Sequence, residues 1–240
     1  MSEITHDDIA WFAVEKINLP KEIADKHRKQ VNLLRERLEA KIDEDPAFDL
    51  VKMLHAGSVA KGTALRTVND LDVAVYVKAG DAPKADSELI PWLAERLAEA
   101  NPNMRSDQFE PQTHCVTINF HGSGLNVDVV PVLYEGDEED RGWLVRKHTG
   151  ERLLTSIPLH LKFMRDRKQL YGDDYKQLIR IVKWWKREKD LRFKSFMIEL
   201  LWARLAATSA PLSDYPTALE DFFVYIVKSG LKERVFFTEY

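Results

Sequence analysis

The sequence contains little cysteine, no long apolar run and no strong charge imbalance. Its one cysteine, Cys115, excludes an intramolecular disulfide and is typical of a protein kept in a reducing compartment. No apolar run is long enough to span a membrane, and the polar, acidic N-terminus lacks the pattern of a secretory signal. A formal net charge of −4 gives no global basic field of the kind that indicates nucleic-acid binding. We therefore expect a cytoplasmic protein with no membrane partner, and nucleic acid stays an open partner.

What the sequence does contain is a globular composition and a regular alternation of elements. A length of 240 residues is enough for one large domain or two lobes. Hydrophobic periodicity predicts helices over residues 20–42, 87–100, 157–168, 173–189 and 219–229, another helix that begins at 195, and a hairpin over 114–120 and 125–133. Residues 142–149 are interpreted as a passage between lobes. The predicted domains are therefore residues 1–150, with the strands, and residues 151–240, with most of the helices.

One strand carries two acids at alternating positions. In Asp70-Leu71-Asp72-Val73 the side chains of Asp70 and Asp72 project from the same face, because successive side chains of a strand point to opposite faces. Two carboxylates on one face repel each other, and a divalent cation relieves that repulsion. The pattern predicts a site for magnesium or manganese.

A glycine-rich stretch precedes this strand. Gly57-Ser58 and Gly62-Thr63 are separated by three residues. Glycine lets backbone amides approach an anion, and the two hydroxyls add donors. Together with the acidic strand, this spacing predicts binding of a metal-bound nucleotide polyphosphate.

A third acid lies in the second strand of the predicted hairpin. Asp128 is the one acid in the otherwise apolar run 125–133, and it shares a face with Asn126 and Val130. A charged residue in such a strand needs a partner, a metal or solvent. Asp128 is therefore the third candidate carboxylate.

The helical part carries a basic stripe and a serine at a helix start. Lys176, Arg180, Lys183 and Arg187 recur on one face of the helix over 173–189. Such a stripe is most often a solvated face, but opposite a phosphate-binding loop it would hold a triphosphate or an oligonucleotide backbone. Ser195 is predicted to be the N-cap of the next helix, and a helix N-terminus also suits a phosphate.

Two sets of motifs resemble a known family. The Gly-Ser, Gly-Thr and Asp-x-Asp pattern resembles the nucleotidyltransferase signature of the polymerase-beta superfamily. Val182-Lys183-Trp184-Trp185, the Ser195 helix start and the long helix over 20–42 are similar to the group that contains cyclic GMP-AMP synthase, oligoadenylate synthase and the bacterial antiphage (CBASS) cyclic-oligonucleotide synthases, the CD-NTases.

The resemblance implies a fold and a set of roles. The fold would be α+β, with a mixed β-sheet nucleotidyltransferase lobe packed on a helical lobe and the active site in the cleft between them. Asp70, Asp72 and Asp128 would be catalytic and would hold two magnesium or manganese ions. Lys186 is the alternative to Lys183 among the phosphate ligands. The triphosphate-binding residues would be Gly57, Ser58, Gly62, Thr63, Lys183 and Ser195.

The implied activity is synthesis of a cyclic di- or oligonucleotide second messenger from nucleoside triphosphates, ATP among them, with release of pyrophosphate, in bacterial antiphage signalling. A regulatory or effector protein would be a further partner. Alternatives are a tRNA- or RNA-tailing transferase, a transferase that adenylylates a small molecule or protein, and a non-catalytic nucleotide-binding regulator. Three intact carboxylates argue against the last of these.

The sequence departs from the family in two respects. Relatives commonly continue past the position of Tyr240, so we expect either a truncated chain or a compact variant. The sequence also has no Cys/His cluster for the zinc-bearing insertion of the animal DNA sensor, which argues against DNA activation of that kind.

Overall fold

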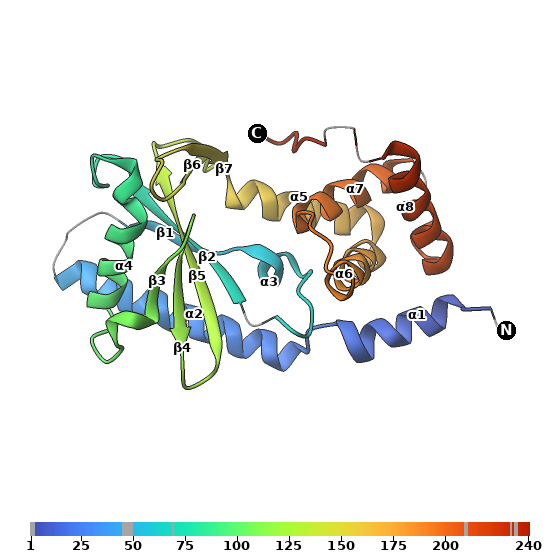
Figure 1. Cartoon of the computed structure of the whole chain (residues 1–240), viewed down its shortest axis with the longest axis horizontal. Helices are drawn as coiled ribbons and strands as arrows, with labels where there is room; N and C mark the ends of the chain where they lie inside the picture. The colour runs from blue at the N-terminus through green and yellow to red at the C-terminus, as the bar shows by residue number, and fades with distance from the viewer. Residues whose placement is uncertain (1–2, 45–49, 69, 209–210, 231, 233–234) are drawn as a thin grey trace. The chain divides into compact units, whose positions relative to one another are not determined.

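A computed structural model describes residues 3–44, 50–68, 70–208, 211–230, 232 and 235–240 (Figure 1). Contacts divide the chain into two compact units. The strand unit comprises Lys21–Lys61, Val68–Leu161 and Tyr240, and the helical unit comprises Met1–Pro20, Gly62–Thr67 and Lys162–Glu239. The helical unit thus takes in the start of the chain and a short internal segment, in addition to the later helices. The predicted domain boundary at residue 150 remains a prediction.

The strand unit contains one mixed sheet. Its strands are β1 (Leu50–His55), β2 (Asp70–Lys78), β3 (Phe109–Pro111), β4 (Val116–Phe120), β5 (Leu125–Tyr134), β6 (Gly142–Val145) and β7 (Arg152–Thr155). Their order is β1-β2-β5-β4-β3, with β6 beside β5 and β7 beside β6. β2 and β5 run parallel, and the other pairs of these strands are antiparallel. The predicted mixed sheet and the predicted hairpin, which is β4–β5, are confirmed.

Helices contact the sheet at several strands. α4 (Leu89–Glu99) packs against β3, β4 and β5 and also contacts α2 (Lys21–Glu44), which in turn contacts β1. α4 follows the 3₁₀ turn η2 (Asp86–Glu88), and a second such turn, η3 (Ser106–Gln108), leads into β3. The helices predicted over 20–42 and 87–100 are confirmed, because their apolar stripes are the faces that the structure buries.

β2 is buried on both faces along most of its length, because Ala74 and Tyr76 lie in an apolar cluster that includes Val132. Residues 142–145 are not a passage but β6. A Cβ on Gly142 would lie 2.5 Å from Val132 Cγ1 and 2.6 Å from the carbonyl oxygen of Leu133, so glycine allows β6 to approach β5.

The helical unit is built around aromatic and branched side chains. Its elements are α1 (His6–Phe12), the π-helical turn η1 (Ala13–Ile17), most of α5 (Ile157–Tyr171), α6 (Asp173–Glu188), α7 (Ser195–Ala207) and α8 (Tyr215–Ser229). Trp202 of α7 stacks on Phe222 of α8 with ring centroids 4.8 Å apart, and both are fully buried. The helices predicted in this part of the sequence are confirmed. Within the described residues, no helix is both long and apolar enough to cross a membrane.

Candidate active site

The predicted carboxylates lie on the two parallel strands. Asp72 of β2 and Asp128 of β5 are register partners, and Asp70 is opposite Asn126. Register partners on parallel strands project from the same face, with the strands about 4.8 Å apart. Asp72 and Asp128 are half-buried, whereas Asp70 begins β2 and is exposed. The structure therefore brings Asp72 and Asp128 together and leaves Asp70 at the solvent-exposed end of the same face.

Gly57 lies directly against Asp72. The amide of Ala56 donates to the backbone oxygen of Asp72 at 2.8 Å, which joins the end of β1 to β2. Gly57 follows with φ +61°, and a Cβ there would lie only 1.6 Å from Asp72 Oδ2. Only glycine both adopts this backbone conformation readily and leaves room for the carboxylate. Gly57 and Ser58 begin a five-residue helix, α3 (Gly57–Lys61), in which Ser58 is half-buried.

Asp128 receives a hydrogen bond from the neighbouring strand. Thr117 Oγ1 of β4 donates to Asp128 Oδ1 at 2.6 Å. Cys115, two residues earlier, precedes β4. Burial raises the pKa of its thiol to about 12, and the nearby charge of Asp128 adds to the effect. The thiol therefore stays protonated, which excludes it as a nucleophile at neutral pH.

The donor set partly fits a divalent cation. In the described ranges, no group of three His, Cys, Asp or Glu side chains is gathered so that it could hold a metal ion. Asp70, the third predicted ligand, lies two residues along β2 from the Asp72–Asp128 pair and on the same face, and its role as a metal ligand stays a prediction. The pair itself offers carboxylate oxygens on one face, the ligands that magnesium and manganese prefer.

Thr63 and Lys183, both predicted phosphate ligands, contact each other inside the helical unit. Lys183 Nζ donates to the backbone oxygen of Thr63 at 3.1 Å and to its hydroxyl at 3.2 Å. The Thr63 hydroxyl is 3.5 Å from a carboxylate oxygen of Glu199. All three residues are buried, with Thr63 fully so. Of the two interpretations of the stripe, a solvated face does not hold at Lys183, because the segment Gly62–Thr67 covers this side of α6.

Two more cations of the basic stripe lie beside this segment, whereas Arg187 is exposed and pairs with Glu188. Arg180 donates to the backbone oxygen of Gly62 at 2.7 Å and to Gln177 at 2.6 Å. A Cβ on Gly62 would lie 3.4 Å from Lys176 Nζ. Burial lowers the pKa of Lys176, and the charge of Lys168 lowers it further. Arg180 therefore holds the segment rather than lining an open face, and Lys176 lies beside it.

Ser195 is not the N-cap that propensity predicts. Lys194 occupies that position, and Ser195 is the first residue of α7. Lys186 Nζ donates to Ser195 Oγ at 3.4 Å. The structure thus brings Ser195 together with Lys186, the alternative to Lys183, and leaves Lys183 with Thr63.

Thr117 was missed at the level of sequence, although a signal for it existed. The hairpin pairs Phe120 with Leu125, and counting back from this pair places Thr117 opposite Asp128. Glu199 was missed because nothing local marks a glutamate in an apolar helix as buried and bonded.

Comparison with known proteins decides the family. No family model matches the chain. The chain is 46% identical over 241 residues to the cyclic AMP-AMP-AMP synthase of Escherichia coli (strain MS 115-1), covering 98% of this chain and 75% of that protein. It is 32% identical over 244 residues to the CBASS oligonucleotide cyclase CdnC of E. coli (strain KTE188), covering 98% of this chain and 76% of that protein.

The chain belongs to the CBASS oligonucleotide cyclases. Cyclases of this family are nucleotidyltransferases that make cyclic oligonucleotide second messengers and generally use divalent metals. The structure of E. coli MS115-1 CdnC with ATP matches this CBASS cyclase with a TM-score of 0.88 and 47% identity, over 98% of this chain and 76% of that one. E. coli DncV, at 15% identity and a TM-score of 0.67, shares the fold. The predicted family, enzyme class and fold class are confirmed.

Proposed function

We propose that this CBASS cyclase uses ATP and joins adenylate units into a cyclic oligonucleotide. The relative with 46% identity is named for a cyclic AMP-AMP-AMP product, and the matching CdnC structure contains ATP. The observation that carries the proposal is the in-register pair of Asp72 and Asp128, with Gly57 packed against the first carboxylate.

Each step of the proposed reaction assigns a task to a residue of the chain. A ribose hydroxyl attacks the α-phosphorus of the donor triphosphate, an oxygen–phosphorus bond forms, and pyrophosphate leaves. Asp128 accepts a hydrogen bond from the attacking hydroxyl and helps to remove its proton. Ser58 donates its hydroxyl to the donor triphosphate. Positioning and neutralisation of charge supply most of the rate.

The metal site is proposed on the same carboxylates. Asp72 and Asp128 would hold a divalent cation, and Asp70 would extend the set to a second ion. When bound, magnesium or manganese ions neutralise the developing charge on the attacking and leaving oxygens. Gly57 keeps the carboxylate of Asp72 free of steric interference.

The distal phosphates are assigned to the helical unit. Ser195 and Lys186 supply a hydroxyl and a cation that already contact each other. Lys183 is assigned to the anchoring of Thr63, which supports the segment that follows α3. Thr63 is not proposed as a ligand, because its hydroxyl is fully buried.

A protein partner and a location complete the proposal. A structure of E. coli MS115-1 CdnC in complex with HORMA-deltaN matches this chain with a TM-score of 0.87 and 47% identity. By that similarity, a HORMA-type protein regulates this cyclase. We place the reaction in the bacterial cytoplasm, where nucleoside triphosphates are made and a lone cysteine stays reduced.

The test is product analysis. The chain is incubated with radiolabelled ATP and magnesium or manganese, treated with phosphatase, and compared with Asp128→Asn and with Asp107→Asn, an exposed carboxylate paired with Arg105. We expect a phosphatase-resistant product that falls by about 100-fold or more in Asp128→Asn, which keeps an acceptor for Thr117, and is unchanged in Asp107→Asn. Label that appears only on added RNA or protein would reject cyclisation and favour an acceptor-dependent transferase.

A further inference from the structure

The hydroxyl of Thr117 is aimed at one specific oxygen of the proposed metal site. Thr117 and Asp128 are register partners on β4 and β5, and the hydroxyl donates to Asp128 Oδ1 at 2.6 Å. That distance falls in the short range of about 2.5–2.7 Å found for hydroxyl–carboxylate bonds with charge assistance. The partner of Asp128 on its other side is Asp72. Asp128 thus lies between a hydroxyl donor and a second carboxylate.

The arrangement restricts how the Asp128 carboxylate can turn. Both residues lie within paired strands, so their backbones are held by the ladder. Threonine is branched at Cβ, which leaves its side chain few rotamers. With Oδ1 engaged by this hydroxyl, rotation about χ2 breaks the bond, and Oδ2 is the oxygen left for a cation.

We propose that Thr117 is a positioning residue that orients the carboxylate of Asp128 for cation binding. The proposal rests on the proposed function, in which Asp128 holds a metal ion. Groups that orient a ligating carboxylate typically change metal affinity or activity by about 10–100-fold when they are removed. A threonine that served only the stability of the hairpin would not affect metal affinity in the folded protein.

The experiment separates the hydroxyl from the shape of the side chain. Thr117→Val keeps the branched shape and removes the donor, and Thr117→Ser keeps the donor and removes the methyl group. Binding of Mn²⁺ is followed by electron paramagnetic resonance with full-length protein and a non-hydrolysable ATP analogue. Thermal melts check folding, and Thr117→Ala replaces the valine variant if that variant does not fold.

We expect Thr117→Val to weaken Mn²⁺ binding by about 10-fold or more and Thr117→Ser to stay within about threefold of the wild type. Equal Mn²⁺ affinity in the wild type and Thr117→Val overturns the proposal, as does equal weakening in both variants. Because the readout is metal binding, absence of a cyclic product from the wild type rejects the proposed function and leaves this result intact.

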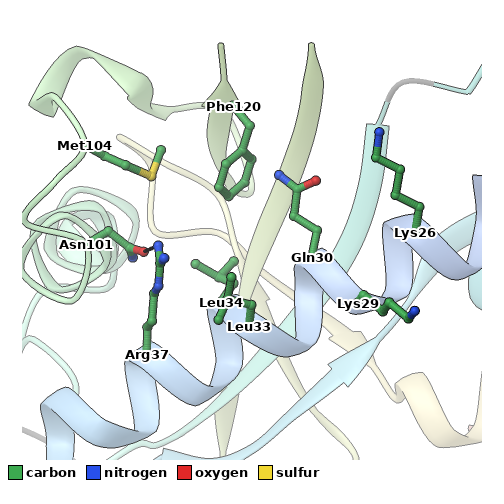
Figure 2. Close-up of a pocket in the computed structure, with 9 residues that line it drawn as sticks. All are labelled: Lys26, Lys29, Gln30, Leu33, Leu34, Arg37, Asn101, Met104 and Phe120. Carbon is green, nitrogen blue, oxygen red and sulfur yellow. Dashed lines mark hydrogen bonds between the residues drawn. The ribbon is translucent and has the colours of Figure 1, made fainter. Parts of the chain in front are cut away.

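A different observation concerns the outer surface of α2. A pocket of about 440 Å³ runs along this helix, bounded on its other side by the residues after α4 and by the end of β4. Figure 2 shows the α2 side chains on one helical face and Asn101, Met104 and Phe120 opposite them. The lining residues are Lys26, Lys29, Gln30, Leu33, Leu34, Arg37, Asn101, Met104 and Phe120.

The pocket is apolar in its middle and cationic at both ends. Leu34 is buried, and Leu33 is 47% exposed. Arg37 donates to Asn101 Oδ1 at 3.1 Å at one end, and Lys26 and Lys29 lie at the other. In the part of the chain that the structure describes, no carboxylate forms an ion pair with these three cations.

The spacing of the cations points to an extended ligand. Lys26 and Arg37 are eleven residues apart, which is about 16 Å along a helix. An extended peptide covers that distance in about five residues at roughly 3.3 Å each. The apolar middle is less suited to nucleic acid, whose phosphates require a continuous row of cations.

We infer that this pocket docks an extended segment of a partner protein that has an acidic residue at each end and a large apolar side chain between them. The cations at the two ends of the pocket attract the acidic residues at the two ends of the partner segment. The central apolar side chain of the segment packs on Leu33, Leu34 and Phe120. The distance between the cations sets the number of residues between the two acidic residues of the partner segment, about five in an extended chain.

The test is selection from a displayed library of random heptapeptides against the full chain. We expect enrichment of acidic–apolar–acidic sequences, and binding of the selected peptides should fall about 10-fold or more in Leu33→Asp. Leu153→Asp, at another exposed leucine that lies in β7 away from the pocket, should bind them normally. Absence of enrichment, or enriched peptides that bind Leu33→Asp as well as the wild type, overturns the inference. Tight binding of a thirty-base-pair duplex that also depends on Leu33 assigns the pocket to nucleic acid and overturns it as well.

Discussion

Replacing Gly57 by alanine should damage the active site through a single methyl group. The new Cβ would lie 1.6 Å from Asp72 Oδ2, 2.3 Å from Cγ and 2.6 Å from Cβ. No side-chain rotation of alanine relieves this contact, so the carboxylate of Asp72 or the backbone at residue 57 must move. The first consequence is therefore displacement of the proposed metal ligand.

The size of the effect follows from the geometry. To restore a separation of about 3 Å, the Cβ–Oδ2 distance must grow by roughly 1.4 Å, and a misplacement of about 1 Å at a catalytic centre can cost about 100-fold in rate. The positive φ of +61° adds a strain of about 1–2 kcal/mol for a residue with a Cβ. We expect product formation to fall by about 100-fold or more.

A matched control separates the strain from the contact. Gly124 has φ +66° in the β4–β5 turn, and nothing lies within 4 Å of a Cβ built there. Gly124→Ala should therefore lose similar stability in thermal melts while keeping its activity, which is measured as cyclic product formed from radiolabelled ATP. If Gly57→Ala retained activity within about threefold of Gly124→Ala, the argument from the Asp72 contact would be refuted.

Three further predictions concern other sites. Lys183→Met removes the hydrogen bond to the buried oxygen of Thr63 and should cost about 1–3 kcal/mol of unfolding free energy. Lys189 is exposed, so Lys189→Met should cost little. Equal urea midpoints for the two variants would contradict the anchoring role of Lys183. Burial, with a smaller contribution from the charge of Lys61, lowers the pKa of His160 to about 4, so below pH 6.5 the unfolded chain binds a proton that the folded chain does not. Between pH 6.5 and 4, the unfolding free energy of the wild type should therefore fall by up to about 1.4 kcal/mol per pH unit more than that of His160→Gln. Urea unfolding free energies that change in parallel with pH in the two proteins would refute this. Lys186→Met should raise the KM for ATP more than it lowers kcat, which steady-state kinetics would check against Lys189→Met.

Local rules were sufficient for much of the fold. The two-residue period of β2 placed Asp70 and Asp72 on one face, and the helical stripes located α2, α4, α6 and α8 to within a few residues. The spacing across the β4–β5 turn even contained the pairing of Thr117 with Asp128. These features depend on neighbours in the chain, and such neighbours are visible in a sequence.

Contacts between distant segments required the tertiary structure. Asp72 and Asp128 are register partners across more than fifty residues, because β2 and β5 pair in parallel through an intervening helix and hairpin. Lys183 was predicted as a phosphate ligand on a basic stripe, but a segment 120 residues earlier in the chain covers it. The local sequence specifies which side chains share a face, whereas the packing of remote segments decides which face is buried and which carboxylates meet.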